Sequence, residues 1–294
     1  MDDRTLLETL DKSTSMLKGS MWRDNFNWNL STTHFHPPAN ELENTRKGEK
    51  AVIIAAGPAF KAKGLEILDK IYDAKPRPFV IACDGALRLF DKSEHTPDVV
   101  VSIDGDPIVA KFYEAELKRK HMVLLATTIH RSVVTKALER GYSVYWFQSP
   151  MPKELQDINV INMLKVFTGG NVGTTSSVLA WGLFGCRPIG LLGIEFAWSD
   201  ETPYYDTQYY PHLKEALHGD EEKIKKQFVT LYNPWVKKKF IADPVYYAYS
   251  VAFKGMWDDL PADVKQGMFT LTPEGIICKT GITYKPLETF LEMT

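Results

Sequence analysis

Three aspartates stand at the ends of two apolar segments, in positions where they could bind a metal ion. The stretch PDVVVSIDGDP (97–107) is an apolar run that ends at Asp104 and Asp106, with one glycine between them. The preceding apolar run, PFVIACDGA (78–86), ends at Asp84. If these runs are neighbouring strands, the carboxylates converge and repel one another unless a cation neutralises them. Because Mg²⁺ typically binds one or two carboxylates together with phosphate oxygens and water, Asp84, Asp104 and Asp106 are candidate metal ligands.

The same aspartates also have a simpler structural explanation. Asp106 is followed by Pro107, which fits a helix N-cap with proline at the first helical position. Asp84 is also placed to cap a helix. Asp104 is separated from the helix by two residues, so capping does not account for it, and a buried carboxylate needs a partner that the local sequence does not supply. Capping and metal binding both remain open for Asp84 and Asp106.

The segment FTGGNVGTTSSVLAWGLFG (167–185) is the strongest single feature of the sequence. A glycine-rich loop leads into a helical segment that begins with four hydroxyl side chains. Backbone amides and hydroxyls in such a loop could bind a phosphate, although a simple capped helix entrance is the alternative. No lysine follows the glycines, which excludes a Walker loop, and the GxGxxG fingerprint of NAD enzymes is absent. The candidate nucleotide-binding residues are Gly57, Gly169, Gly170, Asn171, Gly173, Thr174, Thr175 and Ser176.

Further polar residues follow other predicted strands. Gly57, in AAGPAF, would let a ligand approach the backbone closely. His130 is either a general base or a polar lining residue, and Glu195, in GIEFAW, adds a carboxylate. A tyrosine-rich segment that follows is either a lid or an ordinary surface loop; it contains Tyr204, Tyr205, Tyr209 and Tyr210.

The elements that must position these residues alternate regularly along the chain. Strands that are apolar throughout, most of them followed by a helical segment, are typical of a parallel sheet covered on both faces. We therefore expect a Rossmann-like α/β core at 49–198, an N-terminal helical arm at 1–48, and a C-terminal lid and helical extension at 199–294. Ligands of such a sheet bind at the carboxyl ends of its strands. The expected strands are 51–56, 78–83, 98–103, 121–127, 143–147 and 188–194.

Composition excludes several classes of protein. The chain has 294 residues, with 35 basic and 37 acidic side chains and a net charge of −2, so a dedicated nucleic-acid binder is not expected. The three cysteines are far apart in sequence, which indicates reduced thiols in a cytoplasmic protein. The acidic N-terminus does not resemble a signal peptide. Glycines interrupt the most apolar stretch, 178–198, so no membrane span is expected.

Several motifs together resemble a known domain. AAGPAF, ACDGAL, TPDVVVSIDGD, GGNVGTTSSVLAW and LLGIEFAW occur in the order found in archaeal 6-hydroxymethyl-7,8-dihydropterin diphosphokinases and in the motility accessory factor (Maf) proteins of flagellin glycosylation. The family usually has serine where this chain has Ala59, and aspartate where it has Glu195. The pterin enzymes are in turn distantly similar to thiamine pyrophosphokinases, and this similarity implies that Asp84, Asp104 and Asp106 bind Mg²⁺ and phosphate.

The resemblance implies an Mg²⁺-dependent diphosphotransferase that uses ATP and a small hydroxymethyl acceptor. Its expected catalytic residues are Asp84, Asp104, Asp106, His130 and Glu195. One alternative is a Maf-type glycosyltransferase that uses a CMP-activated nonulosonic acid and needs no metal. Another is a nucleotide-binding module without catalysis. A homo-oligomer is compatible with each of these functions.

Overall fold

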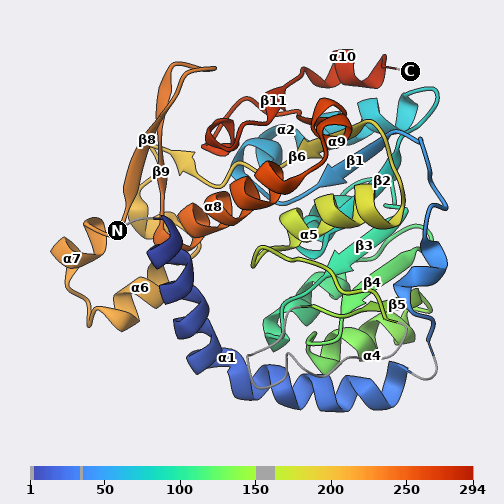
Figure 1. Ribbon diagram of the computed structural model, residues 1–294, viewed down its shortest axis with the longest axis horizontal. Helices are drawn as coiled ribbons and strands as arrows, with labels where there is room; N and C mark the ends of the chain where they lie inside the picture. Colours follow the sequence, from blue (N-terminus) through green and yellow to red (C-terminus); the bar gives the residue numbers. More distant parts are fainter. Residues whose placement is uncertain (1–2, 34–35, 150–162, 294) are drawn as a thin grey trace.

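The computed structural model describes residues 3–33, 36–149 and 163–293. Its centre is a parallel sheet of eight strands in the order β11-β10-β6-β1-β2-β3-β4-β5 (Figure 1). The Rossmann-like α/β prediction is therefore confirmed. The strands are β1 (Ala51–Ile54), β2 (Phe79–Cys83), β3 (Val99–Ser102), β4 (Met122–Ala126), β5 (Ser143–Phe147), β6 (Ile189–Leu192), β10 (Met268–Thr270) and β11 (Thr283–Tyr284).

The sheet includes strands from beyond the predicted core. β10 pairs in parallel with β6, and β11 pairs with β10, so the segment 199–294 supplies one edge of the same sheet. These strands have three and two residues, which is too short for a strand period to be recognised. The chain order reverses direction between β1 and β6, and the carboxyl ends of those two strands are where an open α/β sheet is expected to bind its ligand.

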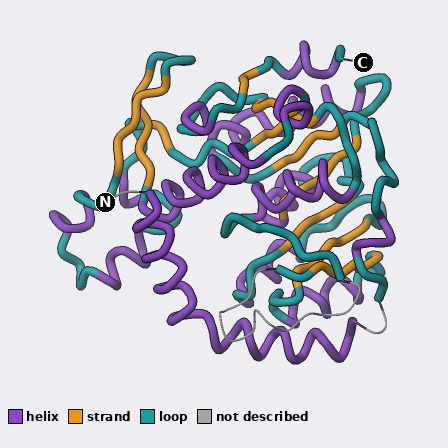
Figure 2. Tube along the Cα trace, viewed as in Figure 1, coloured by secondary structure: helices purple, strands orange, loops and turns teal. Residues whose placement is uncertain are grey.

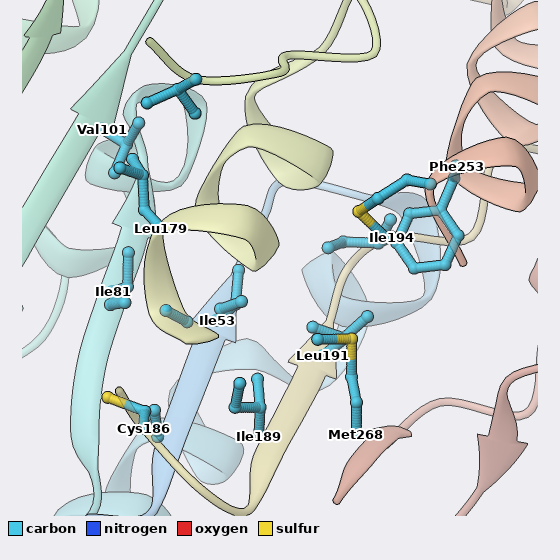
Figure 3. Close-up of a cluster of buried hydrophobic side chains, with 14 of the residues drawn as sticks. Ile53, Ile81, Val101, Leu179, Cys186, Ile189, Leu191, Ile194, Phe253 and Met268 are labelled. Carbon is cyan, nitrogen blue, oxygen red and sulfur yellow. The ribbon is translucent and has the colours of Figure 1, made fainter. Parts of the chain in front are cut away.

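Alternating side chains of each strand enter opposite cores, which explains why the strands read as unbroken apolar runs. Ile53, Ile81 and Val101 pack on one face, in the same buried cluster as Leu179 and Phe253 (Figure 3). Their strand neighbours Val52, Val80 and Val100 pack on the other face. The helices are α1 (Asp3–Thr33), α2 (Pro58–Asp73), α3 (Leu87–Phe90), α4 (Arg131–Glu139), α5 (Val172–Val178), α6 (Tyr210–Ala216), α7 (Glu221–Lys225), α8 (Pro244–Asp259), α9 (Ala262–Gln266) and α10 (Leu287–Leu291), with a 3₁₀ helix, η3, at Pro107–Glu114.

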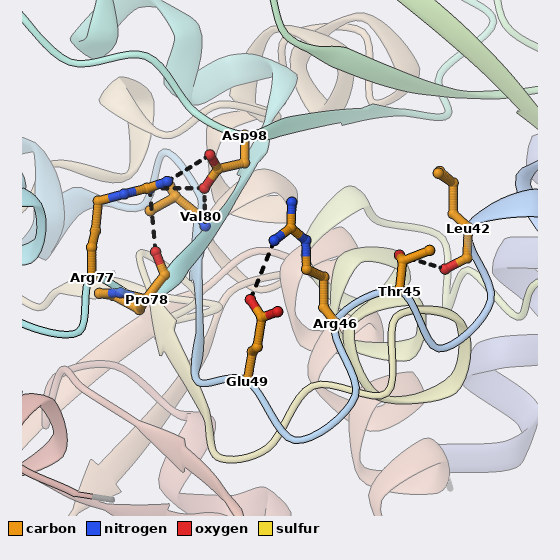
Figure 4. A network of polar contacts seen from close by, with 8 residues as sticks. All are labelled: Leu42, Thr45, Arg46, Glu49, Arg77, Pro78, Val80 and Asp98. Atoms are coloured by element: carbon orange, nitrogen blue, oxygen red, sulfur yellow. Dashed lines mark hydrogen bonds and ion pairs between the residues drawn. The ribbon is translucent and has the colours of Figure 1, made fainter.

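Polar contacts join neighbouring strands at their amino ends, which lie opposite the predicted site. Arg77 forms a bidentate ion pair with Asp98, at 2.8 Å for each nitrogen–oxygen pair (Figure 4). Asp98 also accepts the backbone N–H of Val80 at 2.8 Å, which ties the starts of β2 and β3 together. The predicted site lies at the other end of the strands, their carboxyl ends.

The N-terminal arm consists of one long helix, α1, followed by a segment with a short 3₁₀ helix, η1 (Ala39–Leu42). α1 contacts α4 and α8 and spans the space between them along the edge of the sheet (Figures 1 and 2). A second, antiparallel sheet in the order β7-β9-β8 projects beside α8; its strands are β7 (Trp198–Ser199), β8 (Val229–Asn233) and β9 (Lys238–Ala242). In the described residues, every helix is either too short or too polar to cross a lipid bilayer.

Candidate functional site

A cavity of about 1560 Å³ lies at the carboxyl ends of the strands. Its walls come from the loops after β1, β2, β3 and β6, from the glycine-rich loop before α5, and from α1 and α8. Many of the predicted site residues therefore line a single cavity. The predicted residues that line it are Gly57, Asp84, Asp104, Gly169, Gly170, Asn171, Gly173 and Glu195.

Asp84 is a buried carboxyl group at the end of β2. Its side chain accepts the backbone N–H of Gly85 at 2.7 Å on Oδ1, whereas Oδ2 has no hydrogen-bond partner among the described residues. Burial raises the pKa of Asp84 to about 7; the nearby Ser102 hydroxyl and the Gly85 N–H partly oppose this shift, and the Asp104 charge adds to it. Asp84 therefore has both the free oxygen and the unfavourable charge that a bound cation would correct.

Asp104 follows β3 and faces the same cavity. It is only partly buried, and its Oδ1 accepts the backbone N–H of Asp106 at 3.1 Å. Lys18 of α1 forms an ion pair with the same oxygen at 3.3 Å. The prediction that Asp104 lacks a local partner is wrong, because an aspartate can accept the N–H of the residue two positions later in a turn.

Asp106 does not join the other two aspartates in the cavity. Its Oδ1 accepts the backbone N–H of Ile108 at 2.9 Å and caps η3. Across the described ranges, no group of three His, Cys, Asp or Glu side chains is placed to hold a metal ion. The pair Asp84 and Asp104 still matches the one or two carboxylates that Mg²⁺ uses beside phosphate and water.

Helix α1 explains the glycine between these aspartates. A Cβ atom on Gly105 would lie 2.7 Å from Cδ1 of Trp22 and 3.0 Å from Nδ2 of Asn25. Side chains do not tolerate such short contacts, so Gly105 makes room for the arm. In the DGD triplet, Asp104 faces the cavity, Gly105 admits α1 and Asp106 caps a helix.

The glycine-rich loop forms a second wall of the cavity. Gly169 and Gly170 have φ angles of +53° and +75°, which are left-handed conformations that favour glycine. The Oδ1 atom of Asn171 accepts the backbone N–H of Thr174 at 2.8 Å, and this bond fixes the entrance of α5. The loop thus presents backbone to the cavity.

The hydroxyl side chains of α5 do not line the cavity, contrary to the prediction that they bind phosphate. Thr174, Thr175 and Ser176 are completely buried. The Thr174 hydroxyl accepts a bond from Asn171 at 2.8 Å, the Thr175 hydroxyl donates to the Asn171 carbonyl at 2.9 Å, and Ser176 contacts Cys83 at 3.8 Å between Oγ and Sγ. The loop backbone before α5 therefore replaces these hydroxyls as the phosphate-binding candidate.

Gly57 and Glu195 meet where the chain order reverses between β1 and β6. The Gly57 N–H donates to the Gly193 carbonyl at 3.0 Å, and a Cβ atom on Gly57 would lie 1.7 Å from Oε2 of Glu195. Thr272 donates to Oε1 of Glu195 at 3.2 Å. Gly57 is thus required for packing against the loop after β6, and the Glu195 carboxylate lies at this junction.

His130 caps a helix outside the cavity. Its Nδ1 accepts the backbone N–H of Ser132 at 3.2 Å at the start of α4. Partial burial and the neighbouring Arg131 lower its pKa, and the Asp106 charge opposes this shift. The imidazole does not line the cavity, so the structure does not place it as the expected general base.

The aromatic wall of the cavity was not predicted from the sequence. Tyr246 and Tyr249 of α8 line the cavity, and burial raises the pKa of both phenols. Tyr209 also lines it and contacts Tyr249 at 3.2 Å between hydroxyl oxygens. The expected tyrosine lid thus reduces to Tyr209, because Tyr204 and Tyr210 both donate to Glu221 away from the cavity. Helical spacing in α8 was the available signal, but it equally fits core packing.

Three cationic side chains line the cavity and were not predicted. Arg88 lies over the ring of Phe112, with 5.0 Å between the guanidinium carbon and the ring centroid, and Lys92 is close to it in sequence. Lys18 comes from α1. Nothing in the local sequence marks an exposed lysine or arginine as part of a site, because such residues are most often solvated surface.

Comparison with known proteins identifies relatives of this chain. A family model described as "6-hydroxymethylpterin diphosphokinase MptE-like" matches residues 24–201. A 6-hydroxymethyl-7,8-dihydropterin pyrophosphokinase of Methanocaldococcus jannaschii is 31% identical over 193 residues, which cover 64% of this chain and 74% of that protein.

A solved structure shares the fold. The Maf glycosyltransferase from Magnetospirillum magneticum AMB-1 matches 87% of this chain with a TM-score of 0.56 and 14% identity. The match spans 38% of that longer chain. At this identity the likeness shows a common fold and carries no information on the reaction.

Proposed function

This chain belongs to the MptE-like 6-hydroxymethylpterin diphosphokinase family, and from that premise we propose that it transfers a diphosphoryl group from ATP to a small hydroxymethyl acceptor. The motif resemblance led to the same family. The name of the relative from Methanocaldococcus jannaschii supports a pterin as the acceptor.

The observation that carries the proposal is the pair of carboxylates beside the glycine-rich loop. Asp84 and Asp104 follow neighbouring parallel strands and line one cavity with Gly169 and Gly170. The Asp84 carboxyl is buried, one of its oxygens has no hydrogen-bond partner among the described residues, and its pKa is raised to about 7. These properties are those expected of a carboxylate that binds a cation.

In the proposed reaction, the acceptor hydroxyl oxygen bonds to the β-phosphorus and the bond from that phosphorus to the bridging oxygen of the α-phosphate breaks. AMP leaves, and the hydroxyl proton passes to water or to a carboxylate at the cavity wall. Asp84 and Asp104 would hold Mg²⁺, which neutralises charge on the phosphate oxygens. The backbone of Gly169 and Gly170 would position the phosphates, and the α8 aromatic wall would exclude water from the acceptor. His130 and Asp106, which cap helices, receive no chemical step.

The test is a product assay. The protein is incubated with ATP, Mg²⁺ and 6-hydroxymethyl-7,8-dihydropterin, and AMP and the pterin diphosphate are measured by mass spectrometry. The proposal expects equal amounts of the two products and loss of both with EDTA. ADP as the nucleotide product would indicate transfer of one phosphoryl group, which contradicts the proposal. Release of CMP from a CMP-activated nonulosonic acid, undiminished by EDTA, would support the glycosyltransferase alternative instead.

A further inference from the structure

Helix α1 is fixed to the carboxyl edge of the sheet by two buried asparagines. Asn25 donates through Nδ2 to the carbonyls of Gly105 at 3.0 Å and Thr128 at 3.2 Å. Asn29, one helical turn later, donates to the carbonyls of Thr127 at 2.9 Å and Ile129 at 2.8 Å. Both amide groups are therefore fully used as donors, and they join α1 to the loops after β3 and β4.

The same face of α1 carries two residues that line the cavity. Lys18, Trp22, Asn25 and Asn29 are spaced by four, three and four positions, which places them on one face of a helix. Lys18 and Trp22 line the cavity, and Trp22 lies against the backbone of Gly105. Because the asparagines fix the helix, the position of Lys18 beside Asp104 is set by the fold.

The ion pair with Asp104 does not account for this arrangement. The Lys18 and Asp104 side chains are 36% and 42% exposed, and an exposed ion pair contributes little to stability. An ammonium group has three hydrogen atoms to donate, and the contact with Asp104 uses one of them. Among the described residues Asp104 is its one partner, so the other hydrogen atoms can be donated to a ligand in the cavity that Lys18 lines.

The balance of charges in the cavity indicates what kind of ligand Lys18 would bind. If Asp84 and Asp104 hold one divalent cation, their charges cancel, and the negative charge of a polyphosphate still requires further cations. A lysine at this point meets that need as a compact positive charge. Lys18 also precedes the segment matched by the family model, which begins at residue 24, so this contribution is not given by the family match.

We propose that Lys18 binds the phosphate oxygens of the nucleotide donor, and that α1 is thereby a wall of the binding site. The proposal rests on the proposed function for its ligand, a polyphosphate beside a divalent cation. Lys18 exchanges its ion pair with Asp104 for the phosphate when Asp104 binds the cation. Trp22 closes the same side of the cavity with an apolar surface.

The experiment is calorimetric titration of wild type and Lys18→Met with two probes, α,β-methylene-ATP and inorganic pyrophosphate, each with Mg²⁺. Methionine keeps most of the length of the side chain and removes its charge. We expect both probes to bind about tenfold more weakly, as for loss of a charge-assisted hydrogen bond. Lys18→Arg keeps the charge and is expected to stay within about threefold of wild type. The control is Lys111→Met, which removes an exposed lysine that does not line the cavity and should leave both affinities unchanged.

The outcomes separate this proposal from the proposed reaction. If wild type binds the probes and Lys18→Met binds them equally well, with an unchanged urea midpoint, the role of Lys18 is overturned. Failure of wild type to bind either probe also overturns it. If Lys18→Met weakens binding but the product assay yields no pterin diphosphate, Lys18 remains a phosphate ligand and the proposed reaction alone is wrong.

Discussion

Asp84 connects the stability of the protein to pH. Its pKa rises from 3.8 to about 7 because the carboxyl is buried. Between these values the folded protein holds a proton that the unfolded chain has lost, so stability falls as the pH rises through this window. Above pH 7 the folded protein must hold this buried carboxyl group in its charged form, which lowers the free energy of unfolding by about 4 kcal/mol. A bound cation would offset this cost.

The variant Asp84→Asn tests this at the residue scale in metal-free protein. Asparagine is neutral and can still accept the Gly85 N–H. We therefore expect the free energy of unfolding to rise by about 1–3 kcal/mol at pH 8 and to stay almost unchanged at pH 5. Urea unfolding with a chelator at both pH values measures it. Equal destabilisation at pH 5 and pH 8 would mean that the carboxylate has a structural partner.

Asp104 and Asp106 should behave differently although they are two positions apart. Asp104→Asn is expected to change apo stability by less than about 1 kcal/mol, because its ion pair is exposed. It should reduce the stabilisation by Mg²⁺ and nucleotide by about 1.4 kcal/mol for each tenfold loss of affinity. Asp106→Ala should cost about 1 kcal/mol as a lost helix cap and leave ligand stabilisation intact.

Thermal melting with and without ligand distinguishes these two variants. Asp106→Asn serves as the control, because asparagine also caps helices well. If Asp106→Asn loses as much ligand stabilisation as Asp104→Asn, then Asp106 belongs to the binding site and its assignment as a cap alone is wrong.

At the scale of elements, the docking of α1 depends on its asparagines. Asn25→Ala leaves two loop carbonyls without their donor, and we expect a loss of about 1–3 kcal/mol together with weaker nucleotide binding. Asn27→Ala is the matched control, because Asn27 is exposed on the same helix. Urea unfolding and nucleotide titration of both variants provide the measurement. Equal effects of the two substitutions would mean that helix propensity, rather than docking, determines the result.

The junction of β1 and β6 should tolerate no side chain at Gly57. A Cβ atom there would overlap Oε2 of Glu195 and approach the Gly193 carbonyl to 2.4 Å, so Gly57→Ala is expected to cost about 3 kcal/mol or more. Gly182→Ala is the control, since a Cβ atom there meets nothing within 4 Å. The measurement is the urea midpoint of each of the two variants. A Gly57→Ala protein as stable as the control would show that the junction can open.

Element patterns predicted the sheet better than they predicted the orientation of side chains. Unbroken apolar runs identify parallel strands because both faces of those strands are buried, and the carboxyl-edge rule then brought Asp84 and Asp104 together. The hydroxyl run of α5 was misjudged because this turn of the helix is buried on every side, so none of its hydroxyls faces the cavity. Thr174 and Ser176 are buried, and composition alone could not show which way they face.

At the scale of the whole molecule, the sequence could not show which distant helix completes the site. Lys18 forms an ion pair with Asp104, which is 86 positions away, and a Cβ atom on Gly170 would lie 3.0 Å from Cε1 of Tyr249. Such contacts depend on how α1 and α8 pack over the edge of the sheet. Their residues resemble ordinary surface or core positions when only neighbours along the chain are considered.

The contacts of α1 also set an order of assembly during synthesis. The ribosome makes Asn29 about 100 positions before Ile129, one of its carbonyl partners, and α8 begins only at Pro244. At a synthesis rate of about 5–20 residues per second, α8 is made roughly ten seconds or more after α1. A nascent chain can therefore build the central strands β1 to β5 early, whereas the cavity gains its last wall near the end of translation. The cavity-lining residues Tyr246 and Tyr249 are therefore among the last parts of the site to be synthesised.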